Sequence, residues 1–211
     1  SLVAMIWMCT TTEDWYYTIR YLTQISSMLM GATALTYVIF LSLLQVNKLK
    51  EIPQEVRIVK LVSTTTSAVV LFVVFAIMLP FTLENKWAAF EDEAIFNHLL
   101  IPCLAIITYI CIEHTPKMKF KHIWWTISVV SLYGIVYIAV NFPHLYSNWT
   151  SDPNYDWYEV FLMLREWWPI TIFLFPAIAF LFGWLLWLLN RNIHPGLPKA
   201  PKYKFNIKMK H

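Results

Sequence analysis

The stretch VRIVKLVSTTTSAVVLFVVFAIML, from Val56 to Leu79, decides the fold. A helix needs about 20 mostly apolar residues to cross a hydrocarbon core of about 30 Å, and this stretch is long enough. Its apolar residues are continuous and do not alternate as they do in membrane β-strands. Four other runs have the same character: Tyr21–Val46, Ile95–Ile112, Ile123–Asn141 and Pro169–Leu189. The pattern predicts an all-α, polytopic transmembrane helix bundle with five complete spans, of which Ile95–Ile112 is the shortest.

The composition supports a membrane protein over a soluble globular domain. Hydrophobic residues make up 58% of the chain, charged residues only 14%, and the mean hydropathy is +0.53. These values lie outside the range of average soluble domains. The net charge of +3 does not indicate nucleic-acid binding, because the position of the basic residues between the runs explains it.

Charges between the apolar runs predict the orientation in the membrane. Basic residues gather in two connections and the C-terminal tail: Lys48, Lys50, Arg57 and Lys60; Lys117, Lys119 and Lys121; Arg191, Lys199, Lys202, Lys204, Lys208 and Lys210. Most of the 13 acidic residues lie in the remaining segments. By the positive-inside rule, the basic segments face the cytoplasm. We therefore expect a multi-pass protein of the cell membrane with a cytoplasmic C-terminus.

Both ends of the chain lie outside the five runs. The apolar run Ser1–Cys9 is too short to span as a helix. It is either the end of a partial N-terminal span, which would give about six spans in the full protein, or an interfacial segment. We favour the partial span. The predicted bundle covers residues 1–190, and a basic cytoplasmic tail covers residues 191–211.

Two segments offer surfaces for partners. Membrane lipids are the expected partners of the whole bundle, and the basic tail suits anionic lipids. The outer loop at residues 142–168 is long and rich in Trp and Tyr, which is typical of a lid or a surface-lying segment. Protein partners would bind through this loop or through the tail.

His98 is the clearest candidate for a functional residue within a span, because ionisable groups there are rare and usually functional. Pro102 follows four residues later and cannot donate a hydrogen bond to the His98 carbonyl. We therefore expect a kinked, hydrated turn at the outer end of this span. The competing interpretation is a histidine at the headgroup boundary that bonds a neighbouring residue.

Hydroxyl groups form a second candidate feature. Thr23, Ser26, Ser27 and Met30 share one helical face, which Ala34 and Tyr37 continue. Such a face serves either close helix packing or a nucleophilic hydroxyl. The polar cluster Ser63–Ser67 is better explained by hydrogen bonds between helices, and Gly134 and Gly183 by close helix contact. The spacing of His and Cys residues predicts no metal site, and we expect no cofactor.

Two motifs resemble those of the androgen-induced and androgen-dependent family of membrane proteins and their bacterial relatives. They are Arg20-Tyr21-Leu22-Thr23 and His98 with Pro102, and the loop Thr115-Pro116-Lys117 is also similar. The resemblance implies about six spans, a nucleophilic Thr23 and a partner His98. It also implies hydrolysis of branched fatty-acid esters of hydroxy fatty acids.

The chain departs from the family pattern at several positions. Ala94 stands where the family usually has Asn, and Ser26-Ser27 replaces its Ser-Asn. An alternative register, aligned on Asn97-His98, would put Ile101 at the catalytic position. We prefer the register that His98 and Pro102 anchor.

The resulting hypothesis is an intramembrane hydrolase of lipid (fatty-acid) esters near the outer leaflet. His98 would take the proton of the Thr23 hydroxyl, and Ser26 or Asn97 would support the oxyanion. A non-catalytic membrane subunit or scaffold of a larger complex is the alternative. A small-molecule or lipid transporter ranks third, because the runs show no charged path through their middle.

Overall fold

The computed structural model describes residues 21–82, 90, 94–113, 118–144 and 165–193, and the elements within these ranges are helical. The predicted N-terminal span at Ser1–Cys9, the motif residue Arg20, the loop Thr115-Pro116-Lys117, most of the outer loop and residues 194–211 of the tail lie outside these ranges. The α-helices are α3 (Leu22–Gln45), α4 (Gln54–Val73), α5 (Ile101–Cys111), α6 (Ser128–Asn141) and α8 (Thr171–Ile193). Shorter π- and 3₁₀-helices extend them: η1 (Val74–Thr82), η3 (Phe96–Leu100), η4 (Phe120–Ile127), η5 (Phe142–His144) and η6 (Arg165–Ile170).

Four of these continuous helices are long and apolar enough to cross a membrane: Leu22–Gln45, Gln54–Pro80, Phe120–His144 and Glu166–Ile193. They correspond to four of the five predicted spans, so the all-helical, multi-pass architecture is confirmed at this level. The remaining predicted span corresponds to the shorter apolar helix Phe96–Cys111, and the count of five spans stays a prediction. The last helix continues to Ile193, beyond the predicted span limit at Leu189.

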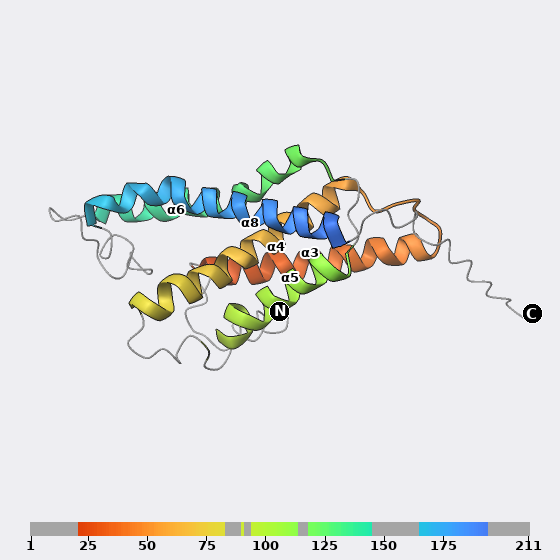
Figure 1. The fold of residues 1–211 in the computed structure, drawn as a ribbon, viewed down its shortest axis with the longest axis horizontal. Helices are drawn as coiled ribbons and strands as arrows, with labels where there is room; N and C mark the ends of the chain where they lie inside the picture. The colour runs from red at the N-terminus through yellow and green to blue at the C-terminus, as the bar shows by residue number, and fades with distance from the viewer. Residues whose placement is uncertain (1–20, 83–89, 91–93, 114–117, 145–164, 194–211) are drawn as a thin grey trace, which may run out of the picture.

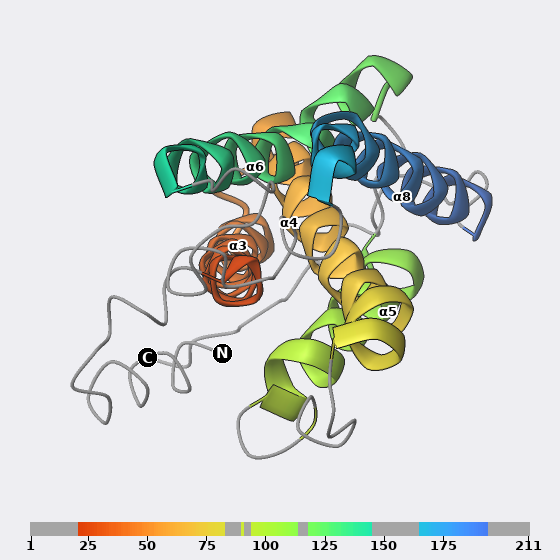
Figure 2. The same ribbon diagram turned by 90° about the vertical axis from the view of Figure 1, so that its left-hand side faces the viewer.

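The helices run along the long axis of the molecule, with α4 at the centre (Figure 1). Figure 2 shows α3, α5, α6 and α8 arranged around α4, and α4 contacts all four of them. Every residue from Lys60 to Val70 is buried, so this helix has no lipid-facing side over that length. The hydroxyl groups of Ser63–Ser67 are therefore buried against other helices and do not face lipid.

One face of α3 packs against this centre, and it differs slightly from the predicted face. Thr23, Ser26, Ser27, Met30 and Tyr37 are buried as expected. Ala34 is exposed, however, and Thr33 is buried in its place. The true helical period of 3.6 residues makes both three- and four-residue steps possible, so the sequence alone did not fix this choice.

A close helix contact occurs at Gly183 but not at Gly134. A Cβ atom at Gly183 would lie 2.5 Å from Oγ1 and 2.6 Å from Cγ2 of Thr126, whereas one at Gly134 would meet no atom of the described residues within 4 Å. Thr126 is buried and its hydroxyl donates to the Ile123 carbonyl at 2.6 Å. The prediction for Gly183 is therefore correct, and the prediction for Gly134 is wrong.

We expect Gly183→Ala to lower the free energy of unfolding by about 1–3 kcal/mol, because α8 must move away from Thr126. Gly134→Ala is the matched control and should be neutral or slightly stabilising, since Ala favours helix more than Gly does. Thermal unfolding of both purified variants in detergent measures the difference. Equal midpoints for the two variants would contradict this helix contact.

Asn190 of α8 closes the end of α5. Its Nδ2 donates to the carbonyl oxygens of Tyr109 and Glu113, and its side chain is buried. The last carbonyls of a helix lack partners within the helix and must find them elsewhere, above all away from water. Asn190 thus anchors α5 to α8.

Replacing Asn190 by Leu should lower the free energy of unfolding by about 1–3 kcal/mol, the cost of leaving buried carbonyl groups without donors. Asn192→Leu provides the control, because Asn192 is exposed on the same helix. Denaturant titration in detergent micelles would compare the two variants. A loss of stability as large in Asn192→Leu would show that apolar substitution itself, and not the carbonyl contacts, is responsible.

Candidate site between α3 and η3

A hydrogen bond joins the beginning of α3 to η3, across 70 positions in the sequence. The Ser27 hydroxyl donates to Asn97 Oδ1 at 2.8 Å, and both side chains are buried. Thr23 lies one turn before Ser27 on the same buried face, with only 7% of its surface exposed. His98 directly follows Asn97 and is half-buried. The hydrogen bond therefore places α3, one turn after Thr23, beside the η3 residue that precedes His98.

The backbone around His98 is irregular, as the sequence predicted. Phe96–Leu100 forms a π-helix, and α5 begins directly after it with Pro102 in its first turn. The missing N–H of Pro102 removes the usual helical partner of the His98 carbonyl, which accounts for the wider turn. π-Turns of this kind are frequent at functional sites.

Ser26 forms a hydrogen bond with a different helix. Its Oγ lies 3.0 Å from Oγ of Ser67 on α4, and either hydroxyl can be the donor. This contact confirms the predicted role of the Ser63–Ser67 cluster in joining helices, although only for Ser67. Ser63 and Thr66 donate to carbonyls of their own helix, and the hydroxyls of Thr64 and Thr65 have no hydrogen-bond partner within the described ranges.

At the other end of α5 lies an ion pair that the sequence analysis missed. Lys60 Nζ on α4 is 3.1 Å from Glu113 Oε1, and the two residues are only 4% and 8% exposed. Lys60 also approaches Met30 Sδ of α3 at 3.6 Å. The assignment of Lys60 to the basic connection before this helix was therefore wrong, because Lys60 lies within α4 and is buried. A lysine inside the apolar run Val56–Leu79 and a glutamate at the end of another run were the available signals.

Burial raises the pKa of the Glu113 carboxyl above its ordinary value, and the Lys60 ammonium opposes this rise. Glu113 follows the end of the apolar helix Phe96–Cys111. Its second oxygen, Oε2, has no partner in the part of the chain that the structure describes. The pair joins α4 to α5 on the side of the bundle away from Asn97.

Comparisons with known proteins add no relative. No protein-family model, no curated protein and no solved structure matches the chain. Within the described residues, no group of three His, Cys, Asp or Glu side chains is placed to hold a metal ion. The chemistry of the site must therefore be argued from its own side chains.

Proposed function

We propose that the chain is an intramembrane hydrolase of lipid (fatty-acid) esters, with Thr23 as the nucleophile and His98 as the general base. The observation that carries the proposal is the Ser27–Asn97 hydrogen bond, which joins α3, one turn after Thr23, to the η3 residue that precedes His98. The two stretches that resemble motifs of the androgen-induced family contain Thr23 and His98, which supports the proposal.

The proposed reaction passes through an acyl-threonine. A neutral His98 imidazole takes the proton from Thr23 Oγ1 as that oxygen attacks the ester carbonyl. The tetrahedral intermediate collapses, the C–O bond to the alcohol breaks, and the imidazolium returns its proton to the departing oxygen. Water, activated by the same imidazole, then hydrolyses the acyl-threonine, which releases the fatty acid and restores Thr23.

Asn97 is the better of the two candidates for the oxyanion. Because Asn97 Oδ1 accepts the Ser27 proton, the orientation of its amide is fixed and its NH₂ group remains a donor. The Ser26 hydroxyl is already engaged with Ser67. A single preorganised donor of this kind typically contributes roughly 3 kcal/mol to the stability of an acyl-transfer transition state.

The exposed apolar surface of α3 favours a membrane lipid as the substrate. Large apolar side chains on α3, including Leu35, Val38 and Ile39, are exposed on the molecular surface and suit contact with acyl chains. Apart from Arg165 in η6, the Lys and Arg residues of the described chain lie after α3, in the first turns of α4, at η4 or at the end of α8. By the positive-inside rule we assign this end of the helices to the cytoplasm and the site near η3 to the outer leaflet. An ester at this interface would have its acyl chains among the helices.

A fluorophosphonate probe tests the proposal by reacting with the activated hydroxyl. We expect purified wild type and Thr23→Ser to be labelled and Thr23→Ala to remain unlabelled. Thr36→Ala is the matched control, since Thr36 is exposed on the same helix and bonds only its own backbone. Equal labelling of wild type and Thr23→Ala would contradict the assignment, and absence of labelling with a stable co-purifying protein would favour a membrane subunit or scaffold.

A further inference from the structure

The ion pair between Lys60 and Glu113 lies where several helices come together. Lys60 Nζ, on α4, is 3.1 Å from Oε1 of Glu113, which follows the end of α5. The same ammonium approaches Met30 Sδ on α3, and the backbone carbonyl of Glu113 accepts a hydrogen bond from Asn190 on α8. The charges of these two side chains therefore influence contacts between α3, α4, α5 and α8.

The ionised pair lacks some of the hydrogen bonds that a buried pair needs. A carboxylate accepts at both of its oxygens, yet Glu113 Oε2 is shielded from solvent and has no hydrogen-bond partner among the described residues. The thioether sulfur of Met30, which the Lys60 ammonium also approaches, is only a weak acceptor. Buried charges are costly unless further hydrogen bonds satisfy them. Because Oε1 faces the ammonium, Oε2 is the atom of the pair to which a proton adds most readily.

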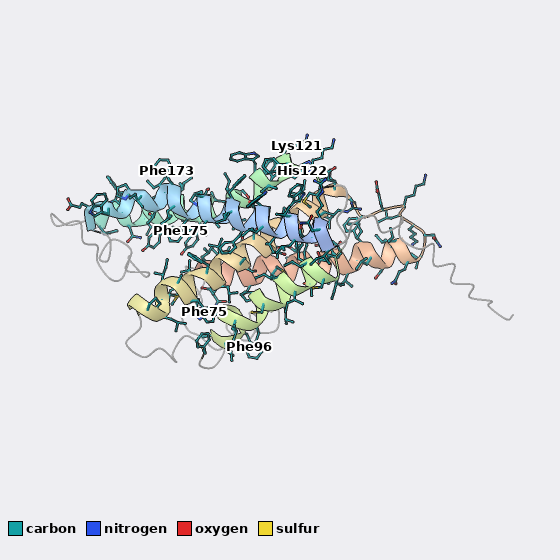
Figure 3. All side chains as sticks on the ribbon, in the orientation of Figure 1. Phe75, Phe96, Lys121, His122, Phe173 and Phe175 are labelled. Atoms are coloured by element: carbon teal, nitrogen blue, oxygen red, sulfur yellow. The ribbon has the colours of Figure 1, made fainter. Side chains whose placement is uncertain are left out.

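Lys60 is the only counter-charge within ion-pair distance of Glu113 in the described chain. The helices packed around the pair carry these other titratable or charged groups at this end of the bundle: Tyr37 on α3, Glu55 and Arg57 on α4, Arg191 on α8, and Lys121 and His122 on η4. Tyr37 interacts electrostatically with Glu113. Lys121 is exposed on the outer side of the bundle, next to His122 (Figure 3). The ionisation of Glu113 therefore depends mainly on burial and on Lys60.

Burial and Lys60 act on Glu113 in opposite directions. Burial raises the pKa of the Glu113 carboxyl, and this effect exceeds the lowering by the Lys60 ammonium. As the pH falls, Glu113 therefore takes up a proton before it reaches the ordinary carboxyl range. The proton comes from water and binds Oε2, while Lys60 keeps its own proton. The pair, which was neutral as a whole, then carries a positive charge.

The Lys60 ammonium can reach water once Glu113 is neutral. A buried ammonium that has lost its carboxylate is strongly destabilised where it lies. Lys60 follows Gln54, the first residue of α4, by six positions, which is about 9 Å along the helix axis. Lysine can keep its methylene groups against apolar surface and extend its ammonium toward water. The ammonium would thus leave Glu113 and Met30 and turn toward the beginning of α4.

We propose that Glu113 is a proton-binding site that acts as a latch between α4 and α5. While Glu113 is ionised, Lys60 is held inside the bundle and joins α3, α4 and α5. Proton uptake at Oε2 releases Lys60 toward the basic end of the bundle and loosens these contacts. The latch is separate from ester hydrolysis at Thr23, so either can fail without the other.

Acetylation of Lys60 by an N-hydroxysuccinimide ester, located by mass spectrometry on the full chain in detergent, measures this release. Exposed Lys48 is the internal reference in the same molecule. At neutral pH we expect the ratio of Lys60 to Lys48 acetylation to rise about tenfold or more in Glu113→Gln, because the neutral amide leaves the ammonium without a counter-charge. Glu55→Gln removes an exposed carboxylate from α4 and is the matched control, which should keep the wild-type ratio.

The wild type provides a second measurement that does not depend on a folded variant. As the pH falls toward the ordinary carboxyl range, its ratio of Lys60 to Lys48 acetylation should rise while the circular dichroism of the helices stays unchanged. A ratio that stays constant, or that rises only together with loss of the helix signal, would overturn the latch. Equal protection of Lys60 in wild type and Glu113→Gln would overturn it as well.

Discussion

Turnover of a fatty-acid ester by the purified protein is expected to fall about 10²–10⁴-fold when His98 is replaced by Ala, which is the usual contribution of a general base. The loss should appear in kcat with little change in KM, because proton transfer stabilises the transition state and not the bound substrate. Thr23→Ala should abolish the acyl-threonine step altogether. Thr23→Ser should retain measurable turnover, since it keeps the hydroxyl.

His144→Ala is the control for the loss of an imidazole. His144 lies in η5 at the end of α6 and is half-buried like His98. Its replacement should leave turnover near the wild-type value. A His98→Ala variant that turns over as fast as wild type would remove the general base from the proposed mechanism. If the probe still labelled Thr23 in the His98→Ala variant, Thr23 would remain the nucleophile and a residue other than His98 would be the general base.

The Lys60→Met variant is expected to lose about 3–5 kcal/mol of its free energy of unfolding at neutral pH, because it leaves Glu113 buried without its counter-charge. The double variant Lys60→Met/Glu113→Leu should lose less than Lys60→Met, since apolar residues often replace a buried ion pair at little cost. Lys48→Met, at an exposed site in the neighbouring connection, should be near neutral. Denaturant titration in detergent micelles measures all three.

The deficit of Lys60→Met should depend on pH. Burial raises the pKa of Glu113, and removal of Lys60 takes away the group that opposes this rise. A carboxyl whose pKa is higher in the folded than in the unfolded state binds its proton more tightly when folded. The variant therefore gains stability as the pH falls toward the ordinary carboxyl range and loses it as the pH rises through the folded pKa. A deficit that stays constant from neutral to acidic pH would argue against an unpaired buried carboxylate.

The candidate site was only partly predictable. Thr23 and His98 were chosen as candidates because they lie in the two motifs. The position of Pro102 predicted an irregular turn at His98, and the structure has a π-helix there. The partner of each hydroxyl was not predictable: Ser27 bonds Asn97, whereas Ser26, its neighbour in sequence, bonds Ser67. Adjacent residues on a helix point about 100° apart, so the rotation of α3 about its axis decides which of the two faces η3. Hydrolysis itself remains a proposal for the experiments above.

The sequence by itself determined which segments form long apolar helices, because hydropathy is a property of consecutive residues and a bilayer fixes the length that they must reach. It also determined the segregation of charge between the two ends of those helices. Only the tertiary structure decided that Lys60 is buried with Glu113 and that Asn190 closes α5. These outcomes depend on the rotation and depth of each helix relative to its neighbours, which arise from packing around α4 and are not encoded in any single run.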